Sequence, residues 1–104
     1  MGEDMATQYL VDKGYKILER NYKNIIGEID IIAEYKGIMV FVEVKYRNND
    51  LYGMPREAVN RGKQLKIRKI ATAYLKMKHK LDKPCRFDVV EILKDSITHL
   101  ENCF

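Results

Sequence analysis

The fold of this chain is decided by residues 27–47, whose sequence is GEIDIIAEYKGIMVFVEVKYR. Isoleucine and valine dominate both halves of the stretch, and such β-branched residues favour strands. Between the halves stands Lys36-Gly37, a pair suited to a tight turn because glycine tolerates positive φ. We therefore predict two strands, 26–35 and 38–46, joined as an antiparallel hairpin.

Four charged residues fall on one face of this hairpin. Side chains alternate between the faces of a strand, so Glu28 shares a face with Asp30, and Glu43 with Lys45. A two-residue turn places Asp30 opposite Glu43 and Glu28 opposite Lys45. A four-residue loop places Glu28 opposite Glu43 instead, still on the shared face. The same alternation predicts that the other face of the first strand carries Ile29, Ile31 and Ala33.

Facing carboxylates suggest a metal site. Two like charges directly across a strand pair repel each other, and a divalent cation between them makes the arrangement favourable. An oxygen-only set suits Mg²⁺ or Mn²⁺, and the backbone carbonyl of Val44 is a further candidate ligand. Lys45 would lie within reach of a metal-bound water, which its ammonium can orient or help to deprotonate. The alternative is the solvated face of an exposed hairpin with a salt bridge or two.

The rest of the sequence predicts an α/β fold. Apolar spacings of three and four residues indicate helices over 3–13 and 56–80. The residues expected on the buried face of the second helix are Ile67, Ile70, Ala71, Tyr74 and Met77. Further strands are expected over 15–22, 86–93 and 97–100. A helix between the hairpin and strand 86–93 implies a parallel crossover, hence a mixed central sheet of about five strands flanked by helices.

The length of the chain indicates the number of domains, and the distribution of charge indicates the class of binding partner. A chain of 104 residues makes one domain, 1–104, and its net charge is +4. Residues 61–86 hold ten basic residues and one acid, Asp82, a local charge of +9. Such a segment indicates contact with a polyanion such as nucleic acid, although a solvated lysine-rich helix face is the alternative. The second helix carries its basic stripe at Lys66, Lys69, Lys76 and Lys80.

Membrane and secretory functions are not expected. The longest apolar run, residues 38–42, is far shorter than the ~20 residues that cross a bilayer. Glu3 and Asp4 have the wrong sign for the start of a secretory signal. Cys85 and Cys103 have neither disulfide-framework nor metal-site spacing, which is typical of a cytoplasmic protein with reduced thiols.

Residues 27–33 and 41–47 resemble the YraN-like family of small bacterial proteins. That family is regarded as a group of predicted endonucleases in the PD-(D/E)xK, restriction-endonuclease-like superfamily, and archaeal Holliday junction resolvases share its core motif. The resemblance covers nearly the whole chain, although Ile29 stands where the superfamily motif has a proline. It implies a three-layer restriction-endonuclease-like fold and Mg²⁺-dependent hydrolysis of phosphodiester bonds in DNA, including branched or repair-intermediate DNA.

The resemblance also implies roles for individual residues. Asp30 and Glu43 fall on the two acidic positions of the superfamily motif, and Lys45 falls on its lysine. Glu3 would correspond to the helix-borne glutamate of resolvase-like members, and either it or Glu28 would complete the catalytic acids. Resolvases that cut two symmetric strands need two copies, so a homodimer is expected.

Candidate nucleic-acid contacts follow the charge pattern. Arg47 and Tyr52 lie in or beside the predicted loop 47–54, where they could hold a backbone or stack on a base. Lys63, near the helix start, could reach a phosphate or the centre itself. The full candidate set is Arg47, Tyr52, Lys63, Lys66, Lys69, Lys76 and Lys80. Two other functions stay open: a catalytically silent nucleic-acid-binding module, and a protein-interaction subunit on a nuclease scaffold.

Overall fold

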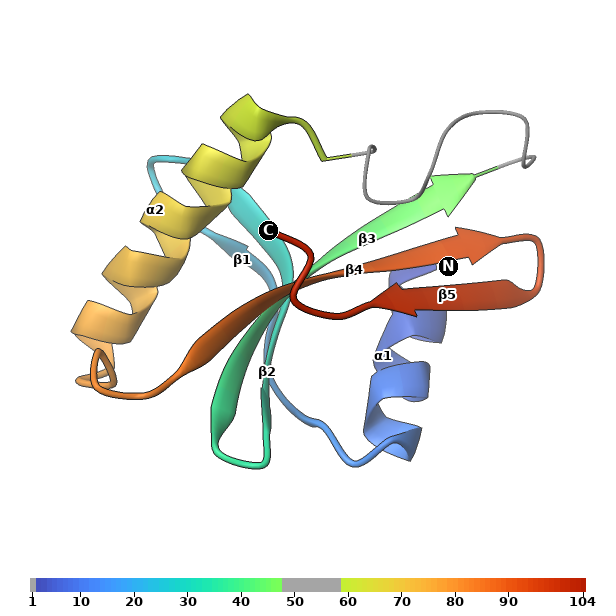
Figure 1. Cartoon of the computed structure of the whole chain (residues 1–104), viewed down its shortest axis with the longest axis horizontal. Helices are drawn as coiled ribbons and strands as arrows, with labels where there is room; N and C mark the ends of the chain where they lie inside the picture. The colour runs from blue at the N-terminus through green and yellow to red at the C-terminus, as the bar shows by residue number, and fades with distance from the viewer. Residues whose placement is uncertain (1, 48–58) are drawn as a thin grey trace.

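A five-stranded sheet lies between two helices in the computed structural model, which describes residues 2–47 and 59–104 (Figure 1). The elements in these ranges are α1 (Gly2–Asp12), β1 (Lys16–Lys23), β2 (Glu28–Tyr35), β3 (Ile38–Arg47), α2 (Arg61–Met77), β4 (Cys85–Leu93) and β5 (Ser96–Leu100). The strands stand in chain order across the sheet. Only β3 and β4 are parallel among the neighbouring pairs, because α2 carries the chain back between them. The predicted mixed sheet is confirmed, and its three layers are compatible with a restriction-endonuclease-like fold.

The β2–β3 hairpin turns at Lys36-Gly37, as predicted. Both residues have positive φ, 50° and 81°, which matches a two-residue turn whose twist suits the flanking strands. Tyr35 pairs with Ile38, and the same register continues to Ile31 and Val42. The two-residue alternative is therefore correct, and the four-residue loop is not formed.

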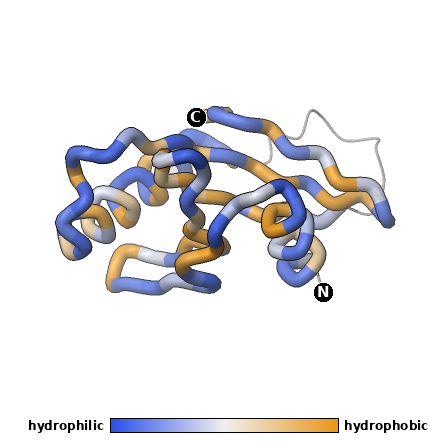
Figure 2. Tube along the Cα trace, turned by 90° about the horizontal axis from the view of Figure 1, so that it is seen from below, coloured by the Kyte–Doolittle hydropathy of each residue, from blue (hydrophilic) through white to orange (hydrophobic). Residues whose placement is uncertain are grey.

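Two apolar clusters hold the layers together, one on each face of the sheet. Ile32 and Phe41 pack toward α2, whereas Val40 and Val42 pack toward Ala6 and the rest of α1. The apolar segments accordingly run through the middle of the molecule in Figure 2. In the described part of the chain, neither helix combines the length and hydropathy that a membrane span requires.

Helix α2 is shorter than the predicted 56–80. It begins at Arg61, because the side chain of Asn60 accepts a hydrogen bond from the Lys63 N–H and caps the helix there. It ends at Met77, whose side chain is 55% exposed. Leu75, four residues beyond Ala71, takes the buried place that we expected for Met77.

The predicted alternation of side chains fails at one point in β2. Ile31 and Ala33 lie on the α1 side as expected, but Ile29 belongs to the cluster under α2. In the β1–β2 ladder the partners before and after this point are Arg20–Ile31 and Tyr22–Ile29. Asn21, between them on β1, has a φ of 52°. This left-handed residue interrupts the regular pleat of β1. Tyr22 and its ladder partner Ile29 on β2 therefore face α2, although alternation along each strand predicts the α1 side.

Candidate functional site

The candidate site lies where β2 and β3 separate. Their ladder ends at Ile31–Val42, after which β2 stays paired with β1 and β3 stays paired with β4. Asp30 is therefore not a ladder partner of Glu43, which corrects the direct cross-strand pairing that we expected. Instead Asp30 is half-buried at the separation, and its Oδ2 accepts a hydrogen bond of 2.8 Å from the Val44 N–H.

The same hydrogen bond fixes the direction of the Val44 carbonyl. The N–H and C=O of one residue in an extended strand point to the same side. Because the Val44 N–H reaches Asp30 of β2, the Val44 carbonyl also faces the gap between β2 and β3. This backbone oxygen is thus directed toward the acidic group.

Glu43 is the most buried acid of the candidate site, with a side chain only 4% exposed. Its Oε1 lies 2.8 Å from the Lys63 Nζ. Its Oε2 is buried and has no hydrogen-bond partner among residues 2–47 and 59–104. An unsatisfied buried carboxylate oxygen is costly, so it marks a place where a cation or a donor would be stabilised.

Lys63 reaches Glu43 of β3 from the first turn of α2, a helix that packs on β2. Asn60 holds the Lys63 N–H at 2.9 Å, which sets the first turn of the helix. Lys63 also precedes Ile67 by one helical turn, so it continues the buried stripe of α2 rather than the exposed one. The spacing alone does not distinguish Lys63, because Lys66 precedes the buried Ile70 by the same four residues and is exposed.

Burial shapes the electrostatics of the acidic pair. It raises the pKa of Asp30, and the charges of Glu3 and Glu28 raise it further, against the hydrogen bond from Val44. Burial also raises the pKa of Glu43, and the neighbouring Asp30 adds to the shift. Both groups therefore resist ionisation unless positive charge is near them.

Two lysines supply part of that charge. Burial lowers the pKa of Lys45, and the charge of Lys63 lowers it further, although Glu43 and Asp30 act in the opposite direction. Burial alone would also lower the pKa of Lys63, but the hydrogen bond and charge of Glu43 outweigh it and leave that pKa raised. The two lysines thus differ: Lys63 is held as a cation, and Lys45 is the one that gives up its proton more readily.

Two further acids, one from α1 and one from β2, act on this centre. Glu3 of α1 and the exposed Glu28 of β2 act on the pKa of Asp30 through their charge. Within the described ranges no three His, Cys, Asp or Glu side chains gather closely enough to form a metal-ligand group. The structure thus brings together Asp30, Glu43, Lys45 and Lys63, and the charges of Glu3 and Glu28 also act on Asp30.

The remaining lysines that we predicted to contact nucleic acid lie outside this centre. Lys66, Lys69 and Lys76 are exposed along α2, while Lys80 follows the helix and is half-buried. Arg47 ends β3. Tyr52 lies outside the described residues. The basic stripe therefore extends along the outside of the helix whose first turn contacts the centre.

A second buried polar cluster surrounds Asp88 of β4, which the sequence marks only as an acid in an apolar strand. Asp88 is fully buried and accepts hydrogen bonds from Arg86 at 2.9 Å to both of its oxygens. The Asn102 N–H donates to Oδ1, and His99 Nε2 lies 2.7 Å from Oδ2. Its oxygens are fully used, so the cluster ties β4, β5 and the C-terminal segment together and has no free ligand atom.

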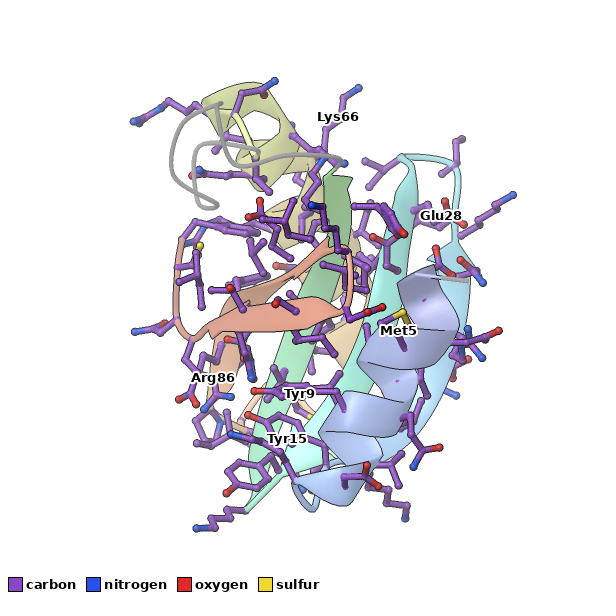
Figure 3. The ribbon with its side chains drawn as sticks, turned by 90° about the vertical axis from the view of Figure 1, so that its right-hand side faces the viewer. Met5, Tyr9, Tyr15, Glu28, Lys66 and Arg86 are labelled. Carbon is purple, nitrogen blue, oxygen red and sulfur yellow. The ribbon has the colours of Figure 1, made fainter. Side chains whose placement is uncertain are left out.

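The two clusters are neighbours along the sheet but lie on opposite faces, since Asp88 pairs with Val42 while Val89 pairs with Glu43, and side chains alternate along a strand. Lys66 and Glu28 lie near one end in Figure 3, while Tyr15 and Arg86 lie toward the other. Arg86 also hydrogen-bonds the Tyr15 hydroxyl, and Tyr9 contacts His99 from α1. In the described chain, the acidic group at the β2–β3 separation thus has a carboxylate oxygen without a hydrogen bond, whereas both oxygens of Asp88 are hydrogen-bonded.

These features define a class of protein: an α/β domain that gathers two acids and two lysines where strands of a mixed sheet separate. The model of the Uncharacterised protein family UPF0102 matches residues 2–92, and the chain belongs to this family. The expected membership of the YraN-like family is confirmed at this level.

Relatives of similar length support the assignment. A UPF0102 protein of Thermodesulfovibrio yellowstonii is 48% identical over 103 residues, which is 99% of this chain and 91% of the relative. One from Persephonella marina is 45% identical over 99% of this chain and 89% of its own length. A third, from Caldanaerobacter subterraneus subsp. tengcongensis, is 46% identical over the whole chain and 91% of its own length.

Proposed function

We propose that this protein is a metal-dependent endonuclease of the restriction-endonuclease-like superfamily that hydrolyses phosphodiester bonds in DNA. The observation that carries the proposal is the buried acidic pair at the β2–β3 separation. Asp30 and Glu43 come from different strands, both have a raised pKa, and the Glu43 Oε2 has no partner in the described chain. A cation bound beside Glu43 would satisfy this oxygen.

The donor set fits Mg²⁺ or Mn²⁺. Carboxylate oxygens of Asp30 and Glu43 and the carbonyl of Val44 are hard ligands, and the Val44 N–H bond to Asp30 Oδ2 holds the acid of β2 against the part of β3 that carries Glu43 and Val44. Mg²⁺ is commonly held by one or two carboxylates while water and substrate phosphate fill its other positions. Two close acids therefore suffice, and Glu3 and Glu28 would act as outer charges.

Different residues of the site would take different roles in the hydrolysis. A metal held here would supply Lewis-acid stabilisation of charge on the phosphate. Lys45, with its lowered pKa, is suited to orient the attacking water and pass its proton to solvent. As the water oxygen bonds to phosphorus, the bond to the leaving oxygen breaks, and that oxygen takes a proton from solvent. Lys63, whose pKa is raised, would stabilise the charge of the phosphate as a cation.

DNA is the favoured polyphosphate because positive charge continues beyond the centre. Exposed Lys66, Lys69 and Lys76 extend from the turn that carries Lys63, within the segment of local charge +9. A row of lysines matches the repeated charges of a nucleic-acid backbone rather than a small phosphate ester. We expect this activity in the cytoplasm. A symmetric double cut would need a homodimer, because each chain supplies one centre.

The test is Mg²⁺-dependent cleavage of branched, flapped, nicked and continuous duplex DNA. Wild type is compared with Asp30→Asn and Glu43→Gln, and Asp95→Asn, an exposed acid of the β4–β5 turn, serves as the matched control. We expect cleavage by wild type and the control only, and calorimetric Mn²⁺ binding that Asp30→Asn abolishes. Cleavage that survives both site substitutions would contradict the proposal. DNA binding that ignores Mg²⁺, without scission, would favour a silent binding module.

A further inference from the structure

A cavity of about 460 Å³ lies beside the candidate centre, between the β1–β2 turn and the first half of α2. Lys63 and Glu28, which border the acidic pair, also line this cavity, and Lys66 adds a second cation. The apolar part of its wall is formed by Ile26, Ile67 and Ile70. The volume is within the roughly 300–1,000 Å³ of pockets that hold small ligands.

One wall of the cavity is a preformed turn. The Asn24 Oδ1 accepts hydrogen bonds from the N–H groups of Ile26 and Gly27 at 2.8 and 3.2 Å. A Cβ at Gly27 would lie 3.4 Å from the Ile70 Cδ1, so the turn packs closely on α2 and closes the cavity there. The turn presents Ile25, fully exposed, and Ile26, 39% exposed, beside the opening between the two elements.

We propose that this cavity binds one unpaired nucleotide of the substrate strand, next to the phosphate that is cut. This inference rests on the proposed nuclease function. The flat face of a base can pack on the isoleucine side chains, and its phosphate can bind Lys66 or Lys63. A nucleotide uses both the apolar and the cationic groups of the wall. A free anion would use only the lysines, and a purely apolar ligand only the isoleucines.

Glu28, the one acid among the described residues of the cavity wall, orients the nucleotide. Glu28 belongs to β2, whereas Lys66 projects from α2, and both lie near one end of the molecule (Figure 3). Repulsion by Glu28 directs the phosphate toward the helix and leaves the base against the turn that holds Ile26.

A site for one unpaired nucleotide predicts that the protein prefers DNA with unpaired bases. A base within a continuous duplex has both faces covered by stacking and its edge paired, so it enters the cavity only after extrusion at a cost of about a few kcal/mol. A base at a gap, flap or branch is already free of at least part of these contacts. The protein should therefore bind gapped or single-stranded DNA more tightly than continuous duplex of the same length.

The experiment measures binding without cleavage. Asp30→Asn protein, free of divalent metal, is titrated with single-stranded, one-nucleotide-gapped and continuous duplex DNA, each carrying 2-aminopurine at one position. We expect the gapped and single strands to bind about tenfold more tightly, with a fluorescence change of the unpaired base. Ile26→Ser should remove most of this preference. Leu65→Ser, at a residue of α2 that is 51% exposed and outside the cavity wall, should keep it.

The outcomes separate the two proposals. Equal affinity for all three DNA forms, or the same effect of Ile26→Ser and Leu65→Ser, would overturn the cavity site while metal-dependent cleavage by wild type still stood. A preference that Ile26→Ser alone removes would support the cavity even if wild type proved unable to cut DNA. No affinity for any DNA would contradict both proposals.

Discussion

The Nζ of Lys63 lies 2.8 Å from the Oε1 of Glu43, which joins the first turn of α2 to the buried end of β3. This ion pair satisfies one oxygen of the carboxylate and leaves Oε2 without a partner in the described chain. Lys63 is 41% exposed, so it can leave Glu43 for a phosphate without becoming a buried, unpaired cation. The contact therefore links the helix that carries the basic stripe to the acidic centre.

Replacing Lys63 by alanine should destabilise the fold. The buried Glu43 would lose its ion pair, and we expect a loss of about 1–2 kcal/mol in the free energy of unfolding, limited by the partial exposure of Lys63. Urea denaturation at pH 7 measures this change. Because Glu43→Gln removes the stranded charge, the double variant should recover part of the loss, and purely additive effects would argue against coupling between the two residues.

Replacing Asp30 by asparagine should stabilise the fold while it removes metal binding. Burial raises the pKa of Asp30, so above that pKa the ionised group disfavours the folded state. An asparagine oxygen can still accept the hydrogen bond from Val44. We expect a melting temperature higher by roughly 4–8 °C for each kcal/mol relieved, measured by calorimetry without metal. Asp95→Asn should leave the melting temperature unchanged, and a lower value for Asp30→Asn would show that its charge is structurally favourable.

Asp88 should control stability in acid. Burial alone would raise its pKa, but hydrogen bonds from His99, Arg86 and the Asn102 N–H leave it lowered. A lowered folded-state pKa stabilises the fold above the ordinary aspartate pKa of about 3.9, and this contribution is lost as the pH falls further.

We therefore expect Asp88→Asn to lose about 3 kcal/mol at pH 7, because the largely buried Arg86 loses its closer carboxylate and keeps the 3.5 Å ion pair with the exposed Glu101, and the difference from wild type should shrink below pH 4. Chemical denaturation between pH 3 and 7 provides the measurement. A difference that stays constant over this range would mean that the ionised form of Asp88 contributes nothing.

The exposed lysines of α2 should determine the salt dependence of DNA binding. If Lys66 and Lys69 each neutralise one phosphate, each alanine substitution should reduce the slope of log K against log salt by about 0.7–0.9. Titrations at several salt concentrations measure the slope. Lys16→Ala, at an exposed lysine of β1, is the control and should leave the slope unaltered. Unchanged slopes for the α2 variants would place the DNA elsewhere on the surface.

Patterns within a few residues predicted most of the fold. Alternating isoleucine and valine located β2 and β3, and Lys36-Gly37 specified their turn and register. The start of α2 was predicted too early, since apolar spacing does not reveal that Asn60 caps the helix. Ile29 was assigned to the wrong face because a single left-handed residue, Asn21 on the neighbouring strand, interrupts the pleat.

The amino-acid sequence by itself determined the strands of the hairpin, its tight turn and the placing of acids along two adjacent strands, because pleating and turn geometry depend on neighbouring residues. Only the tertiary structure decided that β2 leaves β3 beyond Ile31, that Lys63 reaches Glu43, and that Asp88 is enclosed by Arg86 and His99. The contacts of Lys63 with Glu43 and of His99 with Asp88 join different helices and strands, and they arise from how a whole helix or strand packs on the sheet. The periodicity of residues within one segment does not predict that packing.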